Sequence, residues 1–289
     1  MMRVVLYNDT SLINSHFGPQ LVVATVRDQL ARRGSELIGS LHRDALPADN
    51  RKLLSRADLV IVNGEGSIHH GRCPHLIDLA KDFPAVLINC VFQENLSNPA
   101  LARFRIVTAR ESLSAAHLLQ CGAVAVDIVP DLMFATPLLV NWQRGSESKN
   151  DMGLTDNVTN RESGFSPFVD HAVEYLDWLA SHRRVVCGRY HAAVACCVLG
   201  IPFTCWASNT WKIEGMLADM ELPELCHATQ EAAIRHCPAS FDAATAGKVQ
   251  NYVQRARQSI ETHFDAICAS GGADAVRHSA TDRELRRTA

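Results

Sequence analysis

Short apolar runs recur along the first half of the chain, and no other feature limits its fold as strongly. The runs are rich in valine, isoleucine and leucine, and they occupy residues 3–8, 36–40, 57–64, 84–90, 103–110 and 123–130. Strands that are apolar on both faces are typical of a parallel sheet covered by helices on its two sides. Helical stretches lie between the runs, over residues 18–33, 72–81 and 111–121. The first half therefore predicts a doubly wound α/β lobe.

A polar stretch separates this lobe from a second, shorter set of elements. Residues 141–166 have no apolar period and carry glycine, serine and asparagine, so we expect a linker or loop there. Beyond it the pattern predicts a helix from residue 167, a strand over 183–187, a helix over 189–199, a strand over 201–207, a helix over 209–220 and an amphipathic helix over 242–268. The expected organisation is an N-terminal Rossmann-like domain over 1–140, this linker, a smaller C-terminal α/β domain over 167–270 and a flexible tail over 271–289.

Charge and hydropathy exclude several classes of partner. The formal net charge is −3, which supplies no electrostatic argument for binding nucleic acid or an anionic membrane. The apolar run at the start of the chain is too short for a signal peptide. The longest uncharged apolar stretch, 192–207, is shorter than a membrane span and is broken by Gly200 and Pro202. We therefore expect a cytoplasmic protein with no membrane span.

Ten cysteines raise the question of disulfides or a metal site. They are scattered along the chain with one adjacent pair, Cys196 and Cys197, and with no CxxC spacing. Several lie within apolar stretches, where a reduced thiol packs as a small hydrophobic side chain. We expect free thiols, as in a reducing cytoplasm, with no structural disulfide and no bound metal.

The residues that follow each apolar run are candidates for a site, because ligands of open α/β sheets bind at the carboxyl ends of the strands. The strand-like run that ends near residue 62 is followed by NGEGSIHH. Its glycines let the backbone approach a ligand and its successive amides can bind an anion, although an ordinary tight turn also fits. No dinucleotide fingerprint or Walker lysine accompanies it. The candidate substrate-binding residues here are Asn63, Gly64, Glu65, Gly66, Ser67 and His69.

Two further strand ends carry cations. Arg110 begins a helix, where its charge adds to the positive end of the helix dipole and favours a carboxylate or phosphate. A surface ion pair with Glu111 is the alternative. Arg189 and His191 begin an apolar helix after the run at 183–187, so their polar heads would lie at the edge of the sheet. A core histidine bonded to a backbone carbonyl is the alternative for His191.

Together these motifs resemble the polysaccharide pyruvyl transferase family. The resemblance rests on NDTS and HFG after the first strand, VNGEGSIHH, TARES, VPDLMF and CGRYHAAVACCVLGIPF, in this order over residues 4–216. It implies two facing Rossmann-like lobes of glycosyltransferase-B type, and an enzyme that moves pyruvate from phosphoenolpyruvate onto two hydroxyls of a polysaccharide sugar as a ketal. It places Arg110, Arg189 and His191 in the donor site, and Asp9 and Asp131 are further substrate-binding candidates within its motifs. No clear strand follows Asp131, where the family begins its second lobe, so residues 141–166 are expected to replace part of that lobe.

The residue types fit this chemistry. Arginines recognise the carboxylate and the phosphate of phosphoenolpyruvate, and a histidine can exchange the proton that must reach C3. We expect Arg189 and His191 to be catalytic, a small-molecule donor and a glycan acceptor as partners, and no metal or organic cofactor. Two alternatives remain: a nucleotide-sugar glycosyltransferase on the same architecture, and a catalytically silent binding protein.

Overall fold

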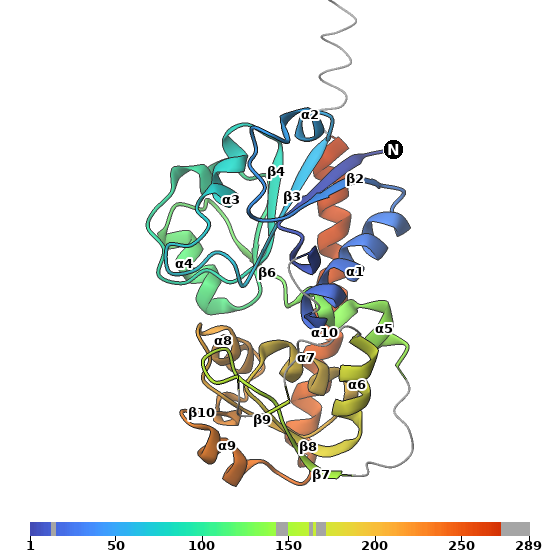
Figure 1. The fold of residues 1–289 in the computed structure, drawn as a ribbon, viewed down its shortest axis with the longest axis vertical. Helices are drawn as coiled ribbons and strands as arrows, with labels where there is room; N and C mark the ends of the chain where they lie inside the picture. Colours follow the sequence, from blue (N-terminus) through green and yellow to red (C-terminus); the bar gives the residue numbers. More distant parts are fainter. Residues whose placement is uncertain (13–15, 143–149, 162–163, 166–171, 273–289) are drawn as a thin grey trace, which may run out of the picture.

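The computed structural model describes residues 1–12, 16–142, 150–161, 164–165 and 172–272, and it contains two lobes that are each built on a parallel sheet (Figure 1). The predicted α/β fold with two Rossmann-like lobes, the second smaller, is thus confirmed. The tail predicted over 271–289 lies outside the described residues from position 273 onward. No helix within the described ranges is both long and apolar enough to cross a membrane.

The first sheet contains six parallel strands in the order β2-β1-β3-β4-β5-β6. Both of its faces are buried: Val4 and Leu6 join the core on one side, and Val5 and Tyr7 join the core on the other. This two-sided burial explains why the inner strands, β1, β3, β4 and β5, are continuous apolar runs. The strands are β1 (Arg3–Tyr7), β2 (Glu36–Leu41), β3 (Leu59–Glu65), β4 (Ala85–Cys90), β5 (Val107–Ala109) and β6 (Asp127–Ile128).

The helices of the first lobe cover the two faces of this sheet. Phe17, Leu21 and Val22 of α1 pack in the core that also contains Val4 and Leu6. The predicted helix over 72–81 is a short α-helix followed by a 3-10 turn. The helical elements are η1 (Thr10–Leu12), α1 (Phe17–Arg32), α2 (Arg51–Leu54), α3 (His75–Asp78), η2 (Leu79–Lys81), η3 (Pro99–Arg103) and α4 (Ser112–Gln120).

The second sheet contains four parallel strands in the order β10-β9-β8-β7, namely β7 (Asn150–Leu154), β8 (His182–Cys187), β9 (Phe203–Trp206) and β10 (Cys226–His227). The sequence predicted a linker or loop over 141–166, but residues Asn150–Leu154 form strand β7, so this part of the prediction was wrong. The segment contributes a strand to the second lobe and does not replace one. Among the described residues β7 pairs with β8 alone, so it lies at the edge of the sheet, and its first two residues, Asn150 and Asp151, are polar and exposed, which hid the strand from pattern analysis. The accompanying helices are α6 (Ala172–Ala180), α7 (Tyr190–Leu199), α8 (Lys212–Asp219), η5 (Pro223–Leu225) and α9 (Gln230–His236).

The last helix, α10 (Ala243–Gly272), runs along both lobes and fastens them together (Figure 1). Its buried side chains belong to a core that contains residues of α1 and α7. In the first lobe Arg33 forms ion pairs with Glu261 at 3.1 Å and with Asp265 at 2.7 Å. The chain crosses between the lobes through η4 (Leu132–Ala135) and α5 (Pro137–Val140), and α10 also packs against η4. The two sheets are therefore held in a fixed relation by a shared core.

Candidate active site between the lobes

A cavity of about 280 Å³ lies where the carboxyl ends of the two sheets face each other. Its walls come from the segment before α1, the turn after β3, the start of α4, the start of α7 and the β9–α8 loop. Most of its ionisable side chains are basic. The lining residues are His16, Pro19, Arg43, Glu65, Gly66, His69, Arg72, Arg110, Val158, Arg189, Tyr190, His191, Ser208, Asn209 and Lys212.

Arg110 is buried at the floor of this cavity, at the end of β5. One of its terminal nitrogens lies 2.5 Å from Oδ2 of Asp131, and its guanidinium lies 4.6 Å from the centre of the Tyr190 ring, so it contacts both lobes. Asp131 also caps η4, where its Oδ1 accepts a hydrogen bond from the backbone of Met133. Burial opposes ionisation of Asp131, but the charges of His191 and Arg110 keep its pKa below the ordinary value. The pair therefore stays charged within the fold.

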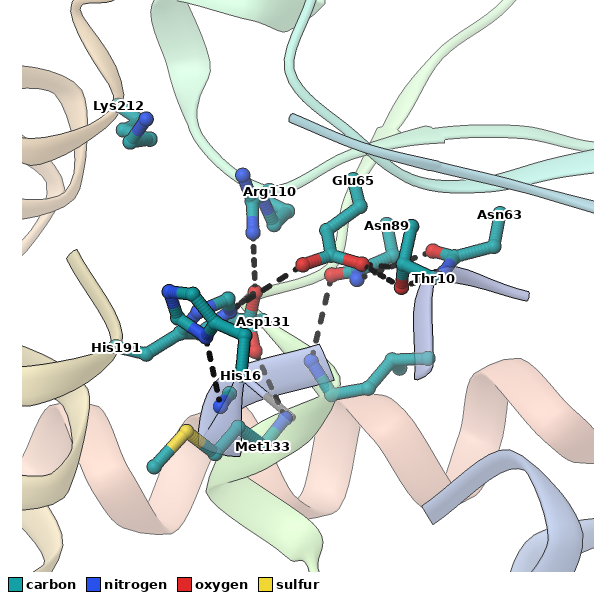
Figure 2. A network of polar contacts seen from close by, with 12 residues as sticks. Thr10, His16, Asn63, Glu65, Asn89, Arg110, Asp131, Met133, His191 and Lys212 are labelled. Carbon is teal, nitrogen blue, oxygen red and sulfur yellow. Dashed lines mark hydrogen bonds and ion pairs between the residues drawn. The ribbon is translucent and has the colours of Figure 1, made fainter. Parts of the chain in front are cut away.

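His191 lies in the first turn of α7 and faces two carboxylates (Figure 2). Its Nε2 is 3.5 Å from Oδ2 of Asp131 and 3.9 Å from Oε1 of Glu65. Gly18, at the start of α1, makes room for the ring, because a Cβ at that position would overlap the imidazole. The alternative of a histidine bonded to a backbone carbonyl is not what the structure shows. His191 instead belongs to a network of charged side chains.

Glu65 ends β3 and turns its carboxylate toward the cavity (Figure 2). Its Oε2 accepts hydrogen bonds from the hydroxyl of Thr10 and from Nδ2 of Asn63. Its backbone φ is 35°, in the left-handed region that residues other than glycine seldom adopt. Strained backbone of this kind persists where the surrounding structure holds it, and it is concentrated at functional sites.

Arg189 precedes α7 and forms a two-point ion pair with Asp156, at 2.8 and 2.6 Å. Asp156 is completely buried in the loop after β7, so the guanidinium is both a cavity wall and the counter-charge of a buried carboxylate. Gly188 lets these backbones meet, since a Cβ there would overlap the carbonyl of Asp156 and the ring of Trp206. Sequence reasoning missed Asp156 because it interpreted the segment as a linker.

Several predicted site residues support the cavity from behind and do not line it. Asp9 is buried beside Ser11 and lies 3.5 Å from Arg27. Gly64 packs against Cys90, where a Cβ would overlap the thiol. The others, Asn63, Ser67 and Asp131, are held in buried hydrogen bonds or ion pairs beside the cavity. The structure brings the remaining predicted residues, Glu65, Gly66, His69, Arg110, Arg189 and His191, to the cavity itself.

Lys212 is the most consequential residue that sequence reasoning missed. It begins α8, and its Nζ donates a hydrogen bond to Oδ1 of Asn209 at 2.9 Å. Burial, followed by the charges of Arg110 and Arg189, lowers its pKa to about 7. A sequence signal for Lys212 was present, because it follows the end of the strand-like run at 201–207. A position after a strand end is the criterion that identified the other site residues.

The remaining missed residues are His16, Arg43, Arg72 and Tyr190. His16 belongs to the HFG motif, and its Nδ1 accepts the backbone N–H of Gly18 at 3.3 Å. Burial and then the charges of His191 and Arg189 lower its pKa. His69 is similarly affected, because burial and the neighbouring His70 lower its pKa to about 4. Anions are therefore favoured in this cavity over further cations.

The described part of the chain contains no group of three or more histidine, cysteine or acidic side chains arranged to hold a metal ion. All ten cysteines, each of which is described, are free thiols. Cys187 and Cys196 approach to 3.9 Å between their sulfurs inside the core of the second lobe. Burial raises the pKa of the Cys187 thiol well above its ordinary value, which makes it a poor nucleophile.

Several solved structures are similar to this chain, and the first of those described next shares its fold. An uncharacterized protein from Klebsiella pneumoniae superposes with a TM-score of 0.53 at 15% identity, over 79% of this chain and 93% of the other. A mutant O-GlcNAc transferase of Thermobaculum terrenum gives a TM-score of 0.49 at 11% identity, over 99% of this chain and 68% of that one. An α-glucosyltransferase in complex with UDP and DNA gives 0.48 at 9% identity, over 91% and 95%.

Among curated proteins, none matches this sequence. The family model of polysaccharide pyruvyl transferases matches residues 12–209, which is more than half of the chain. The match spans the turn after β3, the Arg110 strand end and the start of α7, which are three of the segments that form the cavity. The chain belongs to the polysaccharide pyruvyl transferase family, and it is a transferase.

Proposed function

We propose that this protein transfers pyruvate from phosphoenolpyruvate to two hydroxyls of a sugar, in a cell-surface polysaccharide or its precursor, where it forms a cyclic ketal. The observation that carries the proposal is the cavity between the lobes, where the described lining residues include arginines, histidines and Lys212 around the carboxylate of Glu65. Phosphoenolpyruvate presents a carboxylate and a phosphate close together, and charged donors of this kind bind both. The ten free thiols fit a reducing compartment, so we place the reaction in the cytoplasm.

Arg110, Arg189 and Lys212 are proposed to hold the donor. Arg110 and Arg189 are each fixed by a buried carboxylate, Asp131 and Asp156, which orients the guanidinium before any ligand arrives. Such preorganisation reduces the entropy lost on binding. Burial, and then repulsion by Arg110 and Arg189, lowers the pKa of Lys212, and a bound anion offsets that repulsion.

His191 is proposed to deliver the proton that C3 of the donor must receive. When a sugar hydroxyl attacks C2, the electron pair of the C2–C3 double bond takes this proton and C3 becomes a methyl group. Asp131 lies 3.5 Å from Nε2 of His191, so it can hold the imidazole in position for this transfer. A second hydroxyl then attacks C2, phosphate leaves with the electrons of the C2–O bond, and the ketal ring closes.

Incubation of the protein with phosphoenolpyruvate and a panel of glycans tests the proposal. The expected result is release of inorganic phosphate together with a glycan whose mass increases by one pyruvate less one water. A parallel incubation with nucleotide sugars should release no nucleoside diphosphate. Transfer from a nucleotide sugar in place of phosphoenolpyruvate would contradict the proposal and favour a glycosyltransferase, and binding of the donor without turnover would favour a silent relative.

A further inference from the structure

The cavity contains one side chain suited to receive the proton of the attacking hydroxyl. Among the described residues that line it, Glu65 is the only one with a carboxylate. A sugar hydroxyl is a weak nucleophile until a base within hydrogen-bonding reach accepts its proton. The proposed function assigns a proton donor, His191, and leaves the acceptor of the hydroxyl proton unassigned.

We infer that Glu65 is the general base that activates the acceptor hydroxyls, an inference that rests on the proposed function. The two oxygens of its carboxylate have different surroundings. Oε2 is anchored by Thr10 and Asn63, whereas Oε1 lies 3.9 Å from Nε2 of His191 at the cavity wall. That separation is too long for a direct hydrogen bond. A hydroxyl placed between them would donate to Oε1 beside the imidazole that protonates C3.

The other basic groups of the cavity are less suited to this task. Nδ1 of His16 accepts the backbone N–H of Gly18, and the imidazoles of His69 and His70 contact each other through their Nδ1 atoms. Lys212 loses its proton readily in the empty cavity, but a bound dianion beside it stabilises the ammonium form. With the donor in place, Glu65 is therefore the base that stays available.

The proton inventory of the reaction balances with these two groups. In the first step the hydroxyl O–H breaks, Glu65 receives the proton, the C2–O bond forms and C3 receives a proton from His191. The proton on Glu65 can then pass to the neutral imidazole through the second hydroxyl or a water molecule that bridges the 3.9 Å gap. In the second step Glu65 takes the proton of the second hydroxyl as phosphate leaves, and that proton departs with phosphate or to solvent.

The test compares Glu65→Gln with a matched variant, Glu221→Gln, in donor-binding titrations and in single-turnover transfer to an acceptor glycan that the wild-type protein pyruvylates. Glu221 is an exposed glutamate that also has a left-handed backbone, with φ of 60°, and it lies outside the cavity. Glu65→Gln should bind phosphoenolpyruvate normally and transfer pyruvate about 10²–10⁴-fold more slowly. Glu221→Gln should match the wild type in both measurements.

Rescue by an added carboxylate separates a base from a structural residue. Glu65→Gly relieves the backbone strain and opens a space, so added formate should restore part of its transfer rate, while formate should not accelerate the wild type. An unchanged rate in Glu65→Gln, or a slow Glu65→Gly that formate leaves slow, would overturn the inference and leave the proposed function standing. A wild-type protein that transfers no pyruvate to any glycan would overturn the proposed function, and this inference with it.

Discussion

Lys212 offers the sharpest test of the cationic cavity, because its charge depends on what the cavity holds. Burial and then the charges of Arg110 and Arg189 lower the pKa of Lys212 from 10.5 to about 7. A bound dianion offsets this repulsion, so the pKa of Lys212 rises on binding. Sulfate is a suitable probe, since it remains a dianion throughout the neutral and alkaline range.

The size of the effect follows from proton linkage. The complex holds more protons than the empty protein, so the affinity for sulfate falls as the pH rises above about 7. If binding returns the pKa of Lys212 to 10.5, the affinity should fall about 50-fold between pH 7 and pH 9. The stability of the empty protein should change in the opposite direction: between about pH 7 and 10.5 the unfolded chain holds the extra proton, so the unfolding free energy rises with pH.

Calorimetric titration at constant ionic strength, in two buffers with different heats of ionisation, measures both the affinity and the proton uptake. Lys212→Met should bind sulfate more weakly at pH 7 and should show no fall in affinity by pH 9. Lys248→Met removes a lysine outside the cavity, beside Glu221, and should behave as the wild type. A wild-type affinity that is equal at the two pH values, or a fall that persists in Lys212→Met, would refute the reasoning.

Three other substitutions probe the same cavity. Arg189→Ala should lose about 2–5 kcal/mol of donor-binding free energy. It should also lower the unfolding free energy by about 3–5 kcal/mol, because it leaves the buried carboxylate of Asp156 without its partner. An unchanged melting temperature would show that this ion pair does not support the fold. His191→Ala should keep donor affinity and lower the single-turnover rate by about 10²–10⁴-fold, and normal specific activity in its folded fraction would remove His191 from the mechanism. Gly18→Ala should displace the imidazole of His191. Thermal melts should show a loss of about 1–3 kcal/mol of stability, and single-turnover measurements should show a slower chemical step. A wild-type rate would show that the ring position is not critical.

Much of the fold was predictable because its cause is local. The inner strands of the first sheet, β1, β3, β4 and β5, are buried, so each is an apolar run that can be recognised without knowing its neighbours. Helix α7 was predictable for the same reason, because its residues are buried on all sides and form an apolar run. Its end was also predictable, because Gly200 takes the left-handed φ of 65° that stops a helix. Edge strand β7 failed this test because only part of it is buried, so its residues follow no apolar pattern.

The candidate site was predictable in part, through the rule that ligands bind beyond the carboxyl ends of parallel strands. That rule identified Glu65, Arg110, Arg189 and His191, which all line the cavity. Applied to the end of β9 as well, it would have found Lys212. His16 stands at a helix start within a quoted motif, but neither composition nor spacing distinguishes it from an ordinary capping residue.

The secondary structure and the charged strand ends follow from the order of the residues, because periodicity and turn chemistry act between residues close along the chain. Which of those charges meet depends on the folded arrangement of the strands and helices. Arg110 finds Asp131 across 21 residues, and Arg189 finds Asp156 across 33, from a segment with no sequence signal. The interaction of two charges depends on their distance and on the water excluded from between them, and neither quantity exists until each lobe has folded.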